Sequence, residues 1–220
     1  MAHTFLFADL VGFTALTDAE GDDRAAEVAL GLTHRTRALA PAYGATDVKP
    51  LGDGVMVRCD DAGCAIELAL QIVDQLDDAG FPPVRVGVHT GSAVSRDGDW
   101  FGRGVNVAAR LCSVAAGGEV VVSETARSAA GPLPAVAFGE RRLHWLRNVT
   151  EPVGAYSATG VPVRAARVRI LARRRLRTSS AGRPDAKLRS VALVARITRR
   201  LPPGMRRECT RSGTGAGVAA

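Results

Sequence analysis

Residues 49–56 read Lys-Pro-Leu-Gly-Asp-Gly-Val-Met and place an aspartate between two glycines. An extended segment, 46–51, leads into the Gly-Asp-Gly triplet, and a segment of alternating character, 55–58, follows it. Glycines at a tight turn between two such segments are typical of a β-hairpin. The sequence therefore predicts a hairpin that holds Asp53 at its glycine-flanked tip.

The segments around the hairpin alternate between strand and helix patterns. Residues 4–8 form an apolar, aromatic-rich run that predicts a strand ending at Asp9. Apolar residues recur at helical spacing in 22–41 and 62–76, and 84–89 reads as a strand. Strand, helix, hairpin, helix and strand in this order predict a ferredoxin-like, split βαβ architecture. We expect an α+β fold with a mostly antiparallel sheet and helices on one face.

Further elements complete the predicted folded unit. They are an amphipathic helix over 105–112, a strand over 120–122, a short helix over 124–130, and strands near 136–141 and 153–157. Turn residues at 96–99 precede the first of these helices.

The charge of the chain is divided between two regions. Residues 1–160 carry 13 Lys and Arg against 20 Asp and Glu, a net charge of −7, whereas 161–220 carry 16 against 2, a net charge of +14. All ten aromatic residues lie within 1–160. A highly charged segment without aromatics buries too little apolar surface to offset its ordering entropy. We therefore expect a folded domain over 1–160 and a disordered basic tail over 161–220.

Several classes of protein are excluded by composition. No run approaches the roughly 18–20 apolar residues needed to cross a bilayer, and the N-terminus lacks the basic start of a secretory signal. The four cysteines show no CxxC pair, and the four histidines are scattered, which disfavours a zinc site. We expect reduced thiols in a cytoplasmic protein. Because the chain starts at its first predicted strand, we also expect no sensor or membrane anchor ahead of it.

Two aspartates stand at the ends of predicted strands, Asp9 after the first strand and Asp53 at the hairpin tip. Adjacent strands of one sheet would bring these ends together, and two neighbouring buried carboxylates repel unless a cation lies between them. A hard divalent ion such as Mg²⁺ or Mn²⁺ satisfies this need, and the flanking glycines leave room for a phosphate-bearing ligand. The alternatives are an ordinary turn residue at Asp53 and a helix N-cap at Asp9.

Asn106 and Arg110 are four residues apart on the predicted helix over 105–112 and therefore share one face. An amide can orient a hydroxyl and a guanidinium can neutralise phosphate charge, so the two form a candidate catalytic pair. The same spacing is common on solvent-exposed helices, and the pair alone does not define a site.

Four runs of sequence together resemble the class III adenylate/guanylate cyclase catalytic domain. They are Phe-Ala-Asp-Leu-Val-Gly-Phe-Thr (7–14), Lys-Pro-Leu-Gly-Asp-Gly-Val-Met (49–56), Val-Arg-Val-Gly-Val-His-Thr-Gly (84–91) and Asp-Trp-Phe-Gly-Arg-Gly-Val-Asn-Val-Ala-Ala-Arg-Leu (99–111). They follow the family's order and spacing, and 143–156 resembles its C-terminal strand region. The resemblance covers 1–160 and implies a compact, stand-alone, bacterial-type catalytic domain with the nucleotide cyclase fold.

The resemblance implies an adenylate cyclase that converts ATP to 3′,5′-cyclic AMP and pyrophosphate in cyclic-nucleotide signalling. It implies two divalent metal ions, Mg²⁺ or Mn²⁺, held by Asp9, Asp53 and the carbonyl of Leu10. One ion would activate the ribose 3′-hydroxyl for in-line attack on the α-phosphate, and the other would neutralise the leaving pyrophosphate.

The resemblance also implies which residues contact the substrate. Lys49 and Asp99 match the pair that reads the purine, and a Lys donor for N1 with an Asp acceptor for the N6 amino group favours adenine over guanine. Asn106 matches the residue that orients the ribose, Arg110 the one that stabilises the pentavalent phosphate, and Arg85 the one that contacts the terminal phosphates.

Catalytic domains of this family act as dimers, so the resemblance implies a homodimer with active sites at the interface. The metal ligands and Arg85 would lie on one subunit, and the other would supply Lys49, Asp99, Asn106 and Arg110. The alternative function is a catalytically silent, cyclase-like module that binds nucleotide for regulation. All the metal-binding and transition-state residues are present, which argues against this alternative.

The basic tail admits three interpretations. The arginine cluster over 173–177 could bind nucleic acid or an anionic membrane surface through phosphate contacts. The tail has no aromatic residue to stack on bases and no DNA-binding motif, which weakens the first of these. An accidental extension without a selected function is the third interpretation.

Overall fold

The hairpin predicted around Asp53 is present. The computed structural model describes residues 2–161, in which β2 (Ala45–Leu51) and β3 (Gly54–Cys59) pair in antiparallel fashion around Gly52 and Asp53. Gly52 has φ of 67°, a left-handed value that glycine adopts without strain. Local turn chemistry thus fixes the hairpin. The expectation of a disordered basic tail lies outside the described residues.

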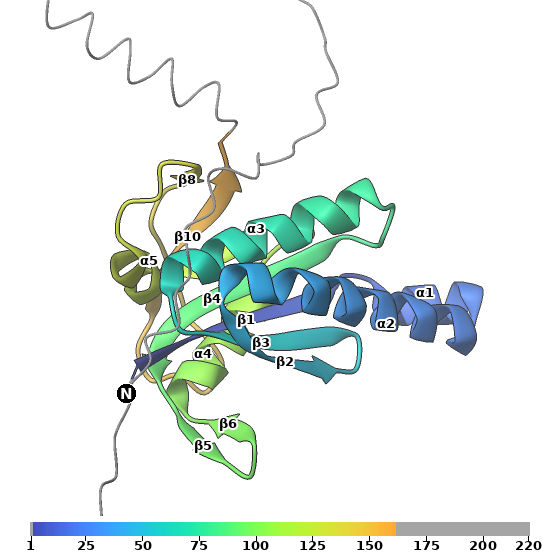
Figure 1. Cartoon of the computed structure of the whole chain (residues 1–220), viewed down its shortest axis with the longest axis horizontal. Coiled ribbons are helices and arrows are strands. Elements are labelled where there is room, and N and C mark those ends of the chain that lie inside the picture. Colours follow the sequence, from blue (N-terminus) through green and yellow to red (C-terminus); the bar gives the residue numbers. More distant parts are fainter. Residues whose placement is uncertain (1, 162–220) are drawn as a thin grey trace, which may run out of the picture.

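The main sheet has the strand order β2-β3-β1-β4-β7-β10-β8, with β9 also paired to β10 (Figure 1). The remaining strands of this sheet are β1 (Ala2–Leu10), β4 (Val84–Ser92), β7 (Val120–Ser123), β8 (Val136–Phe138), β9 (Arg142–His144) and β10 (Val153–Gly160). Among the described strands of this sheet, only β4 and β7 pair in parallel. A mostly antiparallel α+β sheet is therefore confirmed.

Several elements were not expected from the sequence. The hairpin of β5 (Val94–Arg96) and β6 (Asp99–Phe101) forms a separate two-stranded sheet that projects from the main body (Figure 1). Helix α1 (Phe13–Glu20), the 3₁₀ turn η1 (Ala40–Tyr43) and β9 were also missed. The predicted helices are present as α2 (Asp22–Leu39), α3 (Ala62–Asp78), α4 (Arg103–Val114) and α5 (Glu124–Ala130).

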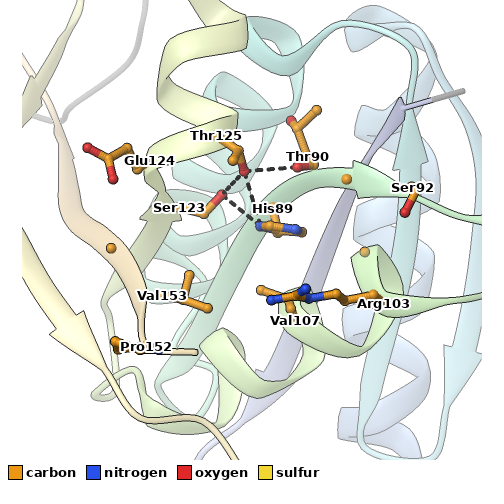
Figure 2. Close-up of a pocket in the computed structure, with 13 residues that line it drawn as sticks. His89, Thr90, Ser92, Arg103, Val107, Ser123, Glu124, Thr125, Pro152 and Val153 are labelled. Atoms are coloured by element: carbon orange, nitrogen blue, oxygen red, sulfur yellow. Dashed lines mark hydrogen bonds between the residues drawn. The ribbon is translucent and has the colours of Figure 1, made fainter. Parts of the chain in front are cut away.

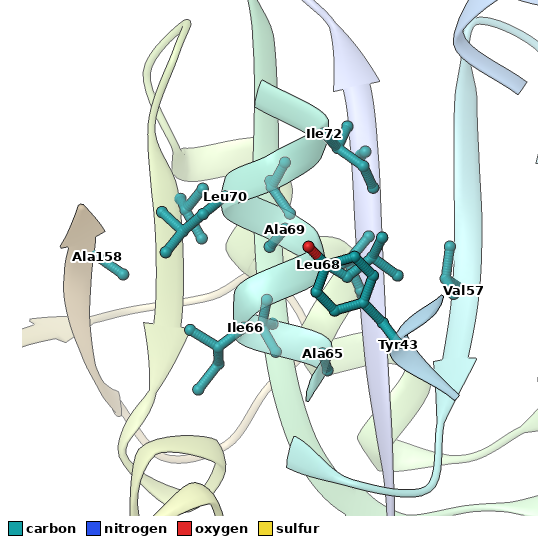
Figure 3. Packing of buried hydrophobic residues seen from close by; sticks show 14 of the residues in the cluster. Tyr43, Val57, Ala65, Ile66, Leu68, Ala69, Leu70, Ile72 and Ala158 are labelled. Atoms are coloured by element: carbon teal, nitrogen blue, oxygen red, sulfur yellow. The ribbon is translucent and has the colours of Figure 1, made fainter. Parts of the chain in front are cut away.

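Helices cover both faces of the sheet, so the expectation of helices on one face is wrong for α4. Leu6 and Ala8 of β1 belong to a core cluster that also contains buried residues of α2, α3 and α5. Figure 3 shows the side chains of α3, including Ile66 and Ile72, packed among the strands. Phe5, on the opposite face of β1, packs instead with Ala108 of α4. β1 is therefore buried on both faces.

Within residues 2–161, each helix is too short or too polar to span a bilayer. Cys59 and Cys112 carry free thiols, and burial raises the pKa of each to about 12, so they are unreactive at neutral pH.

Gly87 of β4 lets α4 approach the sheet closely. A Cβ at this position would overlap the backbone nitrogen of Cys112 and come within 2.6 Å of the carbonyl oxygen of Ala108. Both atoms belong to the backbone of α4, which cannot move aside as a flexible side chain can. The distance of α4 from β4 therefore depends on this glycine.

We predict that Gly87→Ala lowers the free energy of unfolding by about 2 kcal/mol or more, because the added methyl group displaces α4. Urea unfolding of the purified protein measures this change. Gly160→Ala is the matched control, since a Cβ there meets no atom within 4 Å. Equal stability of the two variants would contradict the close packing of α4 on β4.

Candidate active site

Asp9 lies inside β1, where it is paired with strands on both sides. It stands opposite Gly54 of β3 and opposite Arg85 of β4 in the two registers. Arg85 donates to Asp9 Oδ2 from Nε at 2.9 Å and from a terminal guanidinium nitrogen at 2.5 Å. The expectation that Asp9 follows the strand is therefore corrected, because the strand continues through Leu10.

The hairpin tip lies against the end of β1. The backbone nitrogen of Leu10 donates to the carbonyl oxygen of Asp53 at 3.3 Å, which ties the hairpin turn to the residue after Asp9. A Cβ on Gly54 would lie 2.9 Å from the carbonyl oxygen of Ala8 and 3.2 Å from Asp9 Oδ1. Glycine at position 54 therefore allows the Asp9 carboxylate to sit close to the hairpin backbone.

These residues fit a divalent cation. Two carboxylates and a nearby backbone carbonyl are hard oxygen donors of the type that Mg²⁺ and Mn²⁺ prefer. Asp9 and Asp53 are half-buried rather than fully buried, and the charge of Asp9 is balanced by Arg85. Within residues 2–161, no group of three or more His, Cys, Asp and Glu side chains could hold a metal ion. A metal here would need further oxygen ligands, such as those of a phosphate.

A pocket of about 170 Å³ opens beside Asp9. The C-terminal half of α4 forms its other wall through Ala109, Cys112 and Ser113. The carbonyl oxygen of Ser113 accepts a 3.1 Å hydrogen bond from Arg85, which links β4 to α4 at this point. The sequence carries no signal for this contact, because any residue supplies a backbone carbonyl.

Lys49 and Asp99 form an ion pair although they are 50 residues apart in the chain. Lys49 Nζ, on β2, lies 2.5 Å from Asp99 Oδ2, on β6, and the two side chains are 44% and 32% exposed. The backbone nitrogen of Trp100 donates to Asp99 Oδ1 at 2.8 Å. The hydrogen bonds from Lys49 and Trp100 lower the pKa of Asp99, so it is ionised at neutral pH. The pair presents one donor group and one acceptor group to solvent.

Asn106 and Arg110 lie on the exposed face of α4, as their spacing predicts. The opposite face of the helix, which includes Val107 and Leu111, is buried. Neither Asn106 nor Arg110 lines the pocket beside Asp9. Their side chains therefore point away from the core and are available to a ligand or to another chain.

The predicted site residues thus fall into three groups within one chain. The first contains Asp9, Leu10, Asp53 and Arg85, the second Lys49 and Asp99, and the third Asn106 and Arg110. Among the side chains of the described residues, no hydrogen bond or ion pair connects one group to another.

A larger pocket, of about 340 Å³, lies at the other end of β4 (Figure 2). His89 Nδ1 lies 3.0 Å from Ser123 Oγ on one wall, and Arg103 of α4 lines the pocket as well. Burial and the nearby charge of Arg103 lower the pKa of His89 to about 4, so its imidazole is neutral at pH 7. The pocket contains none of the predicted site residues.

Comparison with known proteins identifies the family to which the chain belongs. The adenylate and guanylate cyclase catalytic domain matches residues 2–138, more than half of the chain. The pH-sensitive adenylate cyclase MT1302 of Mycobacterium tuberculosis is 41% identical over 152 residues, which cover 66% of this chain and 38% of that protein. An adenylate cyclase of Streptomyces coelicolor is 42% identical over 117 residues, covering 53% of this chain and 31% of that protein. The chain thus matches about a third of the length of these relatives.

Solved structures agree with this result. An adenylate/guanylate cyclase/hydrolase from Silicibacter pomeroyi superposes with a TM-score of 0.63 at 27% identity, covering 74% of this chain and 97% of that one. An adenylate cyclase from Trypanosoma brucei in its monomeric state superposes with a TM-score of 0.64 at 25% identity, covering 74% and 90%. By sequence and by fold, the chain belongs to the adenylate and guanylate cyclase catalytic domain family.

Proposed function

We propose that the chain is an adenylate cyclase that converts ATP to 3′,5′-cyclic AMP and pyrophosphate in cytoplasmic signalling. The observation that carries the proposal is the register of β1, which places Asp9 opposite Gly54 and Arg85 and beside the turn that holds Asp53. The two similar bacterial proteins are named adenylate cyclases, which supports ATP as the substrate.

Asp9, Asp53 and the carbonyl of Leu10 would hold two divalent ions at the end of β1. Bound Mg²⁺ or Mn²⁺ lowers the pKa of the ribose 3′-hydroxyl and neutralises charge on the phosphates. Asp9 would then no longer need Arg85 to balance its charge. The guanidinium of Arg85 would be released toward the terminal phosphates, where a planar fork of donors binds two oxygens at once.

Lys49 and Asp99 would recognise the base. Adenine presents an acceptor at N1 and a donor at its N6 amino group, which complement an ammonium and a carboxylate. In the structure these two side chains lie next to each other and are partly exposed, which supports recognition of one purine edge by both.

Asn106 and Arg110 would act on the reacting atoms. The Asn106 amide orients the ribose so that its 3′-oxygen attacks the α-phosphorus in line with the departing pyrophosphate. Arg110 donates hydrogen bonds to the pentavalent phosphate, where negative charge develops. Both residues are exposed on α4 and away from the Asp9 pocket of the same chain, so we propose that they act on substrate bound to a second copy.

Asp53→Ala should reduce cyclic AMP formation by the full chain with ATP and Mn²⁺ by about 100-fold or more, because phosphate charge is no longer neutralised. Quantifying the product by mass spectrometry tests this directly. Asp78→Ala, at an exposed position at the end of α3, is the matched control and should retain activity. ATP binding by the wild-type protein without any cyclic product would instead support the catalytically silent module.

Asp99→Asn should lower the preference for ATP over GTP about tenfold, because the amide replaces a charged acceptor with a group that can also donate to guanine O6. The ratio of kcat/KM for the two nucleotides measures this preference. Asp97→Asn is the control, since Asp97 is exposed in the same hairpin and already adopts φ of 51°, a value that Asn tolerates. A shift of equal size in both variants would disprove the role of Asp99.

A further inference from the structure

Trp100 attaches the β5–β6 hairpin to the main sheet. The hairpin pairs only with itself among the described strands, and a two-stranded ribbon of three-residue strands is marginally stable alone. The Trp100 ring packs against the rings of His3 and Phe5 of β1, at centroid distances of 4.5 and 5.8 Å. Asp99 precedes Trp100 in the same strand and points to the opposite face. Anchoring the indole therefore also fixes the direction of the Asp99 carboxylate.

Arg58 of β3 extends this contact to β2. Its Cζ atom lies 5.0 Å from the centroid of the Trp100 ring, within the range of a cation–π interaction. The same guanidinium donates to Thr46 Oγ1 of β2 at 2.7 Å and lies 3.3 Å from His3 Nδ1. With only 15% of its side chain exposed, Arg58 makes these contacts largely out of water. Arg58 thus connects Trp100 to the strand that carries Lys49.

The protonation state of His3 suits this arrangement. Burial and the positive charge of Arg58 lower the pKa of His3, so the ring is neutral at pH 7. A neutral imidazole can accept a hydrogen bond at Nδ1 from the Arg58 guanidinium. Asp60 pairs with the same guanidinium and balances its charge. We name His3, Arg58 and Trp100 the indole cluster.

The indole cluster supplies the rigidity that the Lys49–Asp99 pair lacks. Exposed ion pairs contribute little to stability, so this pair cannot by itself hold a projecting hairpin in place. We propose that Trp100 is a positioning residue for purine recognition, since its packing in the indole cluster holds Asp99 where the carboxylate meets the adenine amino group. This inference rests on the proposed function, because it concerns selection of that reaction's substrate.

Trp100→Leu tests the inference, with Trp145→Leu as the matched control, since Trp145 is 77% exposed. Binding of the non-cyclisable α,β-methylene analogues of ATP and GTP is measured by calorimetry on the full chain with Mn²⁺. Losing one aligned hydrogen bond to the base should lower the adenine preference of Trp100→Leu about tenfold. KM for ATP should rise while kcat at saturating ATP changes less than about threefold, because Trp100 does not touch the reacting atoms. The Trp145→Leu variant should match the wild type.

Two further variants separate positioning from a general loss of structure. Trp100→Phe keeps an aromatic face for Arg58 and should restore most of the adenine preference. Arg58→Gln removes the cation over the indole and should lower the preference even if Trp100→Leu fails to fold. Equal weakening of both analogues together with a lower Tm, or an unchanged preference in Trp100→Leu, would overturn the inference.

The binding measurement also distinguishes this inference from the proposed function. Suppose that the wild-type protein makes no cyclic AMP but prefers the ATP analogue, and that the Trp100→Leu variant lacks this preference. This result would disprove the proposed reaction and would still support the role of Trp100. A wild-type protein that binds both analogues equally would overturn the inference, since there would be no purine selection to position.

Discussion

The pairing of β1 with β3 on one side and β4 on the other is the constraint on which the candidate active site depends. Because the side chains of a strand alternate between faces, a shift of either register by one residue would point the Asp9 side chain into the core on the other face of the sheet. Both faces of β1 are buried, which makes such a shift costly: Phe5 and Leu6 are both completely inaccessible to solvent. The packing of the core therefore fixes where Asp9 meets Gly54 and Arg85.

The charged groups of the candidate site are held in two ion pairs. Asp9 is balanced by Arg85, and Lys49 by Asp99, and each of these side chains is partly exposed. Ion pairs at such positions are weak in water, so under the proposed function a metal ion would take the place of Arg85 beside Asp9 at little cost. The charged groups are held in place by the rigid parts of the structure. These are the sheet, the close contact of α4 at Gly87 and the indole cluster.

Local patterns predicted much of this fold and of the site. The hairpin tip at Asp53 depends on turn chemistry, and the exposed face with Asn106 and Arg110 depends on helical periodicity. The face of the sheet that α4 covers could not be predicted, because β1 is apolar on both faces and shows no alternation. The strands β5, β6 and β9 have three residues each, too few for a periodic signal.

The contacts within the candidate site could not be predicted from the sequence, because they depend on tertiary structure. The Asp9–Arg85 pair follows from a register between strands, and the Lys49–Asp99 pair joins residues that are 50 positions apart. Neither contact is visible in local sequence patterns. Resemblance to a known family named these residues, but only the structure shows that one chain presents them as separate groups.

The central claim, that two chains complete each active site, is tested most directly by mixing two inactive variants. Asp53→Ala removes a proposed metal ligand, and Arg110→Ala removes the group proposed to stabilise the transition state. In an equal mixture of tagged chains that copurify, half of the dimers would contain one intact site of two, so about one quarter of wild-type cyclic AMP formation should return. A mixture as inactive as each variant alone, despite copurification, would contradict the account.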